Sequence, residues 1–214
     1  MPDPVTCADC GASFTPRAEL LERFPGWTPR TCPSCYRKGS GGGRPRGGGR
    51  SSVAAPQLTL DQARQLPASG PDSGLFTDGG CVPNPGPGGW GAVYVVDGEV
   101  VDEAHGHDPA TTNNRMELTA IARGIELVPV GTPCIVWSDS NLAVRTVNEW
   151  AAGWERRGWK RKAGPVENLD LVRPLYEAMR SRPELELRWI KAHAGHRWNE
   201  YADALANTWN TAGT

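Results

Sequence analysis

Apolar and polar positions alternate regularly only after residue 74, and there they predict a body of mixed strands and helices. Apolar runs bounded by turn residues predict strands, whereas apolar positions three and four residues apart predict helices. Strands are expected at 75–80, 89–97, 100–107, 134–138 and 185–190. Helices are expected at 114–128, 140–150, 166–181 and 197–210. Three strands followed by alternating helices and strands predict an α/β fold, a mixed sheet with helices on its faces.

Before residue 74 the apolar pattern gives way to glycine, proline and arginine. Residues 39–50 read GSGGGRPRGGGR, which can neither pack nor hold regular structure. We therefore predict a flexible linker at 39–73, between a small module at 1–38 and a domain at 74–210. A short helix after Thr59 or Asp61 is the only element expected within this linker.

The charge is divided unevenly between the two parts of the chain. Residues 1–56 carry 8 Lys/Arg against 4 Asp/Glu, and the remainder carries 15 against 20. A basic head on an acidic body favours contact of the head with a polyanion, although a solvated linker with incidental arginines has the same composition. The first ten residues contain no apolar run, and no stretch is long and apolar enough for a membrane span. These features predict a cytoplasmic protein without a membrane segment.

Two Cys-x-x-Cys pairs stand in the head, at Cys7 and Cys10 and at Cys32 and Cys35. Two thiolates on a tight turn can face one ion, and two such turns complete a tetrahedral zinc site. Two disulfides or free thiols are the alternatives, and disulfides are disfavoured in a reducing compartment. So short a module needs a clip of this kind to fold, which makes the zinc structural.

The cysteine pattern resembles a zinc ribbon, a class of module that binds nucleic acid or protein. Arg30, Arg37 and Lys38 beside the second pair favour nucleic acid. The alternative is a docking module for replication or repair proteins.

Four acids and a histidine stand at positions typical of a site rather than a scaffold. Asp78 and Asp139 each end a predicted strand, and Asp78 is followed by a long Gly/Pro loop. Glu117 lies in the first turns of a helix that follows a cluster of N-cap residues. Asp203 lies within the last helix, and His193 in the loop before it. Taken singly, Glu117 and Asp203 are also explained as solvated helix acids, and Asp139 as a helix N-cap.

Five motifs in order along the chain resemble type 1 ribonuclease H. They span about 135 residues, from strand-ending Asp78 to the last helix. They are TDGGCVPNPGPGGWGA at 77–92, TTNNRMEL at 111–118, WSDSN at 137–141, GWKRKAGPVENLDL at 158–171 and WIKAHAGHRWNEYADALA at 189–206.

The resemblance implies a ribonuclease H-like fold, a five-stranded mixed sheet of order 3-2-1-4-5 flanked by helices. It implies that acids at four positions converge on two Mg²⁺ ions, with Mn²⁺ as an alternative, and that Gly79 lies at this metal site. Hard oxygen ligands suit both ions. His193 resembles the family's proton shuttle, whereas His196 is interpreted as structural. The four acids are Asp78, Glu117, Asp139 and Asp203.

The same matches imply contacts with an RNA–DNA hybrid. Residues resembling the family's contacts with RNA 2′-hydroxyls and with a DNA-strand phosphate are Cys81, Asn84, Thr112, Asn113, Asn114 and Asn141. A basic, tryptophan-rich segment resembles the handle that seats the DNA strand, and its candidate contacts are Trp150, Arg156, Arg157 and Lys160. The chain departs from the family at Asn141, where glutamine is common, so this amide is shorter.

Two functions follow from these features. The first is a monomeric endonuclease that hydrolyses the RNA strand of RNA–DNA hybrids by two-metal-ion catalysis and leaves 5′-phosphate ends, with the N-terminal module adding affinity. The second is a catalytically idle hybrid- or duplex-binding protein on the same fold. The presence of all four acids and the loop histidine favours the endonuclease.

Overall fold

The computed structural model describes residues 4–7, 11–15, 58–161 and 164–211, and the chain forms two units, Met1–Ala54 and Ala55–Thr214. In the first unit an antiparallel pair joins β1 (Val5–Thr6) to β2 (Ser13–Phe14). Gly11 has a positive φ of 70° in the turn between them, and its amide donates to the Cys7 carbonyl at 2.9 Å. Cys7 is buried. The other three cysteines of the predicted zinc site lie outside the described residues.

The second unit is built on a five-stranded mixed sheet whose strands lie in the order β5-β4-β3-β6-β9. Strands β3, β4 and β5 pair in antiparallel fashion, and β6 and β9 continue the sheet from β3 in parallel. The predicted mixed sheet is thereby confirmed. The bounds are β3 Gly74–Cys81, β4 Gly86–Val96, β5 Glu99–Thr111, β6 Cys134–Ser138 and β9 Leu185–Trp189.

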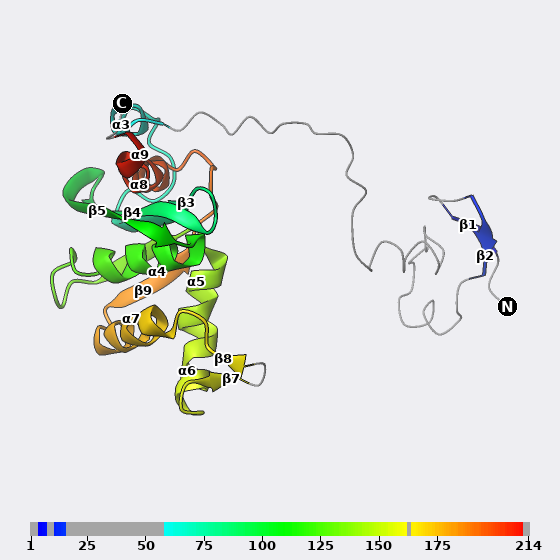
Figure 1. Cartoon of the computed structure of the whole chain (residues 1–214). Coiled ribbons are helices and arrows are strands. Elements are labelled where there is room, and N and C mark those ends of the chain that lie inside the picture. The colour runs from blue at the N-terminus through cyan, green and yellow to red at the C-terminus, as the bar shows by residue number, and fades with distance from the viewer. Residues whose placement is uncertain (1–3, 8–10, 16–57, 162–163, 212–214) are drawn as a thin grey trace. The chain divides into compact units, whose positions relative to one another are not determined.

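Helices cover both faces of the sheet (Figure 1). Helices α3, α8 and α9 lie on one side, and α4, α5 and α7 on the other. Alternate residues of the central strand point to the two layers, so that Leu75 belongs to the core under α4 and Phe76 to the core under α8. The helix bounds are α3 Leu60–Arg64, α4 Asn113–Gly124, α5 Asn141–Arg145, α6 Ala151–Glu155, α7 Leu169–Ser181, α8 Arg197–Ala206 and α9 Thr208–Thr211.

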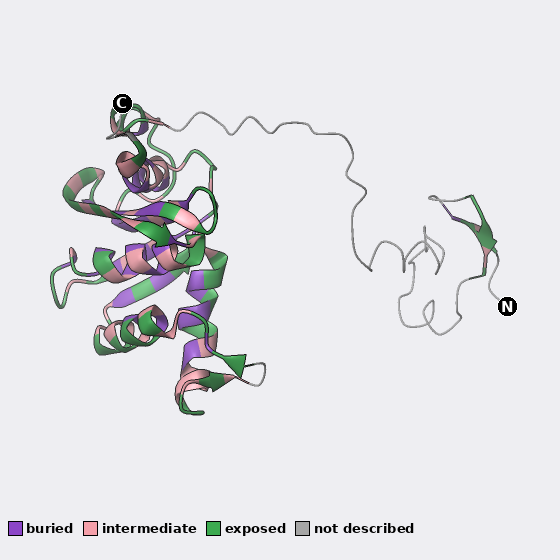
Figure 2. Ribbon diagram, in the orientation of Figure 1, coloured by how far each residue is buried: buried purple, intermediate pink, exposed green. Residues whose placement is uncertain are grey.

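The core lies between the sheet and these helices, as the buried residues in Figure 2 show. Helix α8 buries one face through residues three and four apart, including Trp198, Ala202 and Leu205. This is the apolar face that its sequence pattern predicts. Within the part of the chain that the structure describes, no helix combines the length and apolar character needed to cross a membrane.

The predicted linker ends earlier than residue 73, which is a correction to the expected domain boundary. Helix α3 forms after Thr59, whose hydroxyl accepts from the Gln62 amide at 3.2 Å in a capping box. Ala63 is fully buried in the core under α8. Leu58 and Leu60 pack against the same core. Composition does not reveal such long-range packing, which is why the segment resembled a tether.

The expected helix at 140–150 is longer and interrupted. Helix α5 leads into a π-helical segment η1 (Thr146–Trp150) and then into α6. A short hairpin follows, with β7 (Lys160–Arg161) paired to β8 (Gly164–Pro165). This protruding part of the unit carries the predicted basic handle.

Candidate active site

The central strand and its parallel neighbour bring two acids together. Thr77 on β3 is in register with Ser138 on β6. The next residues, Asp78 and Asp139, are therefore side by side. Asp139 follows the end of β6, as expected, whereas Asp78 does not end its strand, because β3 continues to Cys81. Asp139 is not the helix N-cap, because the Ser140 hydroxyl accepts from the Ala143 amide at 3.3 Å. The Asp139 carboxylate is thus available to the site.

Helix α4 supplies the third acid. Its N-cap is Thr112, so Glu117 lies in the second turn, close to the predicted position. Gly79 allows this approach, since a Cβ at that position would collide with the backbone of Met116 and Glu117. Oxygens of Asp78, Glu117 and Asp139 all lie within 4.8 Å of one another. The structure therefore converges three of the four predicted acids on one point.

The fourth acid and the loop histidine form a second group beside the first. Ligand atoms of His193, Glu200 and Asp203 lie within 4.8 Å of one another. The Nδ1 atom of His193 is 3.7 Å from the Glu200 carboxylate. His193 is largely exposed, with 76% of its side chain accessible, whereas Glu200 has only 12%.

The carboxylates are held at an electrostatic cost. Burial raises the pKa of Asp78 well above its usual range, and the charges of Asp139 and Asp203 raise it further. Burial raises the pKa of Glu117 in the same way, with Asp78 as the next contributor. Burial also raises the pKa of Asp139, although the hydrogen bond from Asn199 lowers it in part. The pKa of Asp203 is raised by burial as well, and the charge of His193 partly offsets this rise.

The donor set fits divalent cations. Oxygens crowd together here, and Oε2 of Glu117 and Oδ1 of Asn199 are buried with no hydrogen-bond partner among the described residues. A buried oxygen without a donor is unfavourable unless a cation or water satisfies it. Carboxylate and amide oxygens are the ligands that Mg²⁺ and Mn²⁺ prefer.

The predicted RNA-side residues form a hydrogen-bonded group after strand β3. The Cys81 amide donates to Oδ1 of Asn113 at 2.7 Å. Oδ1 of Asn84 accepts from the Asn113 amide at 3.3 Å and from the Cys81 thiol at 3.4 Å. The Gly/Pro loop is thus tied to the start of α4, next to Thr112. Asn141 is exposed at the start of α5.

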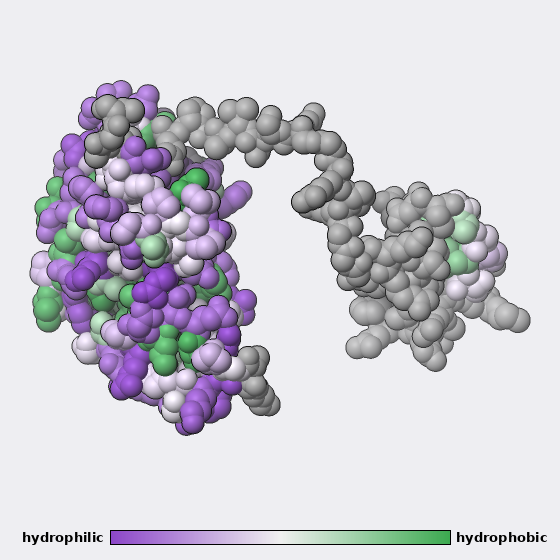
Figure 3. Space-filling view, viewed as in Figure 1, coloured by the Kyte–Doolittle hydropathy of each residue, from purple (hydrophilic) through white to green (hydrophobic). Residues whose placement is uncertain are grey.

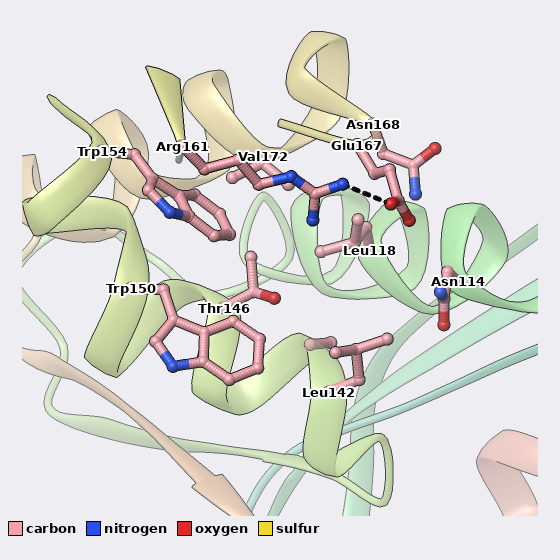
Figure 4. Close-up of a pocket in the computed structure, with 11 residues that line it drawn as sticks. Asn114, Leu118, Leu142, Thr146, Trp150, Trp154, Arg161, Glu167, Asn168 and Val172 are labelled. Carbon is pink, nitrogen blue, oxygen red and sulfur yellow. Dashed lines mark hydrogen bonds and ion pairs between the residues drawn. The ribbon is translucent and has the colours of Figure 1, made fainter. Parts of the chain in front are cut away.

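A cavity of about 300 Å³ opens between α4, the α5–η1–α6 segment and α7 (Figure 4). Two predicted contacts, Asn114 and Trp150, line it. Trp154 lies beside Trp150, with ring centroids 6.1 Å apart. Arg161 extends into this cavity and donates to Glu167 at 2.6 Å. Helix α4 borders both the cavity and the acidic site, because Leu118 lines the cavity and the adjacent Glu117 belongs to the acidic cluster.

The predicted handle residues Arg156, Arg157 and Lys160 are all exposed. Figure 3 shows a mostly hydrophilic face of this unit with small, scattered hydrophobic areas. The handle therefore offers its charges to solvent rather than to the core.

Three residues near the acids were missed by the sequence interpretation. Nδ2 of Asn199 donates to Oδ2 of Asp139 at 3.3 Å, and Nε1 of Trp189 donates to the Asp139 carbonyl at 3.0 Å. Glu200 faces His193. Asn199 and Glu200 precede Asp203 by four and three residues, so helical spacing alone would have placed all three on one face. No local signal identifies Trp189.

Known proteins share the part of the chain that carries this site. A family model described as RNase H matches residues 71–210. The chain is 48% identical over 136 residues to "Ribonuclease HI" of Caulobacter vibrioides, covering 62% of this chain and 89% of the relative. It is 47% identical over 134 residues to "Ribonuclease H" of Herminiimonas arsenicoxydans, covering 62% and 90%. The crystal structure of LC9-RNase H1, "a type 1 RNase H with the type 2 active-site motif", is similar with 33% identity and a TM-score of 0.55, covering 69% of this chain and 76% of that one.

Proposed function

The chain belongs to the RNase H family, and we propose that its acidic site carries out the family's reaction with bound divalent ions. The protein is a ribonuclease H, an enzyme that hydrolyses the RNA strand of RNA–DNA hybrids. The observation that carries the site assignment is the convergence of Asp78, Glu117 and Asp139 within 4.8 Å, with a buried Glu117 oxygen that lacks a donor.

The four acids would hold two Mg²⁺ ions, with Gly79 at the same place and Mn²⁺ as an alternative. Such a pair, when bound, supplies an activated water and stabilises the leaving 3′-oxygen, which gives 5′-phosphate products. The protein's own contribution is to fix the oxygens before substrate arrives. Strand register holds Asp78 and Asp139, and the close approach of α4 holds Glu117.

His193 is suited to carry a proton to or from the reacting phosphate. It is exposed on the loop before α8, and a ring nitrogen lies within 4.8 Å of an Asp203 carboxylate oxygen. Glu200 limits where the ring can go, because it lies 3.7 Å from Nδ1.

RNA is distinguished from DNA by its 2′-hydroxyls. We assign this contact to the amides around the Gly/Pro loop, where Cys81, Asn84 and Asn113 are linked by hydrogen bonds. Asn114 and Asn141 flank them. The cavity at Trp150 and the exposed charges of the handle would seat the DNA strand, with Thr112 near one of its phosphates.

The N-terminal module is proposed to hold a structural zinc with four thiolates and to add affinity for the hybrid. Buried Cys7 and the turn at Gly11 support a tight turn at the first cysteine pair. The basic charge of residues 1–56 supports a polyanionic ligand.

Replacement Asp139→Asn tests the site. It keeps the shape of the side chain but removes its charge, so Mg²⁺-dependent cleavage of a labelled hybrid should fall by at least about 100-fold, while hybrid binding stays within about two-fold. Arg123→Gln on the far end of α4 is a matched control for charge removal, since Arg123 pairs only with its neighbour Glu126 at 3.5 Å among the contacts described. Cleavage at the wild-type rate by Asp139→Asn would show that the acids are not the site.

A further inference from the structure

The segment between α3 and β3 contacts the loop that carries His193. We define residues 58–70 as the N-terminal strap; the RNase H family model begins only at residue 71. The Ser69 hydroxyl donates to the Gly195 carbonyl. The Arg197 amide donates to the Ser69 carbonyl at 3.4 Å, and its Nε donates to the Leu66 carbonyl at 2.7 Å. Three hydrogen bonds thus join the strap to residues 195–197.

The strap also lies directly against a side chain of this loop. Gly70 has a φ of 82°, and a Cβ there would be 2.5 Å from Nδ1 of His196. The ring of His196 therefore occupies the space beside the Gly70 backbone. The loop is restrained both by hydrogen bonds and by this close packing.

The strap is itself anchored. Ala63 is buried under α8. Nη2 of Arg64 donates to the Tyr201 hydroxyl at 2.7 Å, and that hydroxyl donates to Glu103 at 2.7 Å. Tyr201 is almost fully buried and lies two residues before Asp203 on α8. The strap is therefore a fixed support on the core.

The loop it supports adopts a conformation that needs support. His193 has a φ of 48°, a left-handed conformation uncommon for residues other than glycine, and Gly195 follows with a φ of 77°. The His196 side chain makes no capping hydrogen bond to α8, and the α8 side chain that faces the His193 ring is Glu200, 3.7 Å from Nδ1. A backbone of this kind persists when surrounding contacts impose it.

We propose that the N-terminal strap positions His193 for the reaction, with Ser69 as the positioning residue that acts through Gly195. The proposal rests on the function and on the role of His193 given above. A catalytic side chain held in its productive geometry reacts faster, whereas substrate binding at the amides and handle does not depend on it. Loss of the Ser69 hydroxyl should therefore lower kcat and leave KM unchanged.

The test is a double-mutant cycle in the full-length protein. Ser69→Ala should lower kcat on a labelled RNA–DNA hybrid by about 5-fold, the worth of one hydrogen bond. Its KM should stay within about two-fold of wild type, and Ser69→Thr, which keeps the hydroxyl, should restore kcat. In a His193→Ala background the same change should alter kcat by less than about two-fold, because the residue through which Ser69 acts is gone.

Ser73→Ala is the matched control. Its hydroxyl accepts from the Asp97 amide at 2.9 Å, away from the His193 loop, and kcat should not change. An equal loss of kcat for Ser69→Ala with and without His193, or no loss at all, would overturn the proposal. If wild-type protein does not cleave hybrid, the proposed function fails instead. Amide hydrogen exchange at residues 191–196 then tests separately whether the strap restrains the loop. Faster exchange in Ser69→Ala than in wild type supports the restraint, and equal exchange refutes it.

Discussion

At the scale of single residues, Gly79 sets the distance between the central strand and α4. The atoms that a Cβ would meet at Gly79 belong to the helix backbone, which cannot move as a side-chain end can. Its neighbour Gly80 has nothing within 4 Å of the same added atom. The two adjacent glycines therefore differ in kind: one is required for packing, and the other is not.

Gly79→Ala should lower the free energy of unfolding by about 1–3 kcal/mol, the usual cost of overpacking. It should also lower kcat, because α4 carries Glu117 away from the other acids. Gly80→Ala should change stability by less than about 0.5 kcal/mol. Chemical denaturation of both variants, with hybrid cleavage alongside, checks this. Equal destabilisation by the two substitutions would contradict it.

The raised carboxyl pKa values predict a pH dependence of the cation-free protein. An acid with a higher pKa in the folded state binds more protons folded than unfolded, so the free energy of unfolding falls as pH rises from the ordinary carboxyl range through the raised pKa. Asp78 is such a group, chiefly because of burial. Asp78→Asn should therefore be more stable than wild type at about pH 7 in EDTA, by about 3 °C in Tm, and the difference should shrink toward about pH 4.

Thermal unfolding in EDTA across this pH range measures the effect. Added Mg²⁺ should raise the Tm of wild type more than that of Asp78→Asn, since cation binding to the folded state stabilises it. A variant less stable than wild type at neutral pH would show that the acid cluster is not under repulsion.

At the scale of elements, the handle is a helix with an interruption. Trp150 ends the π-helical segment η1, and the Arg145 guanidinium lies 4.8 Å from the centre of its ring. Insertions of this kind turn the following residues about the helix axis, and they are frequent at functional sites. The turn directs Trp150 and Trp154 toward the cavity and leaves Arg156 and Arg157 in solvent.

A triple change of Arg156, Arg157 and Lys160 to glutamine should weaken hybrid binding and leave kcat unchanged. If all three charges meet phosphates, the slope of log K against log salt should become shallower by about 2–3, because each neutralised phosphate contributes about 0.7–0.9. Binding titrations at several salt concentrations measure this slope, and Arg173→Gln on α7 provides a control arginine that pairs with Glu177 at 2.9 Å. An unchanged slope would place the DNA strand elsewhere.

The sequence predicted the helices and strands themselves better than the irregular segments and long-range contacts that connect them. Periodic apolar residues identified the strands of the five-stranded sheet and the helices α4, α7 and α8, but not the short hairpins β1-β2 and β7-β8. The motifs identified the acids that the structure brings together. The π-helical turn was not predicted, since the sequence at Thr146–Trp150 has ordinary helical spacing. Helix α3 was expected as a short helix but assigned to a tether, because its packing depends on a distant partner, Tyr201. Nonlocal contacts of this kind leave no periodic trace.

At the scale of the whole molecule, the chain joins an acidic catalytic unit to a basic N-terminal unit. Removing residues 1–54 should leave kcat unchanged, because the second unit begins at Ala55 and contains every acid of the site. Affinity for the hybrid should fall, and its salt dependence should become shallower, if the N-terminal unit binds nucleic acid. Unchanged affinity would favour a protein partner for that unit. Metal analysis of the full-length chain and of a Cys7→Ser variant tests the zinc.

The register between β3 and β6 has a consequence for how this enzyme can vary. Because Thr77 lies opposite Ser138, inserting or deleting one residue in either strand ahead of its acid, Asp78 or Asp139, would turn that acid to the opposite face of the sheet. Variation in length is therefore confined to the connections, such as the turn at Val130, which is 87% exposed. Length changes in that turn should be neutral in an insertion library, whereas the same change inside β6 should eliminate every active clone.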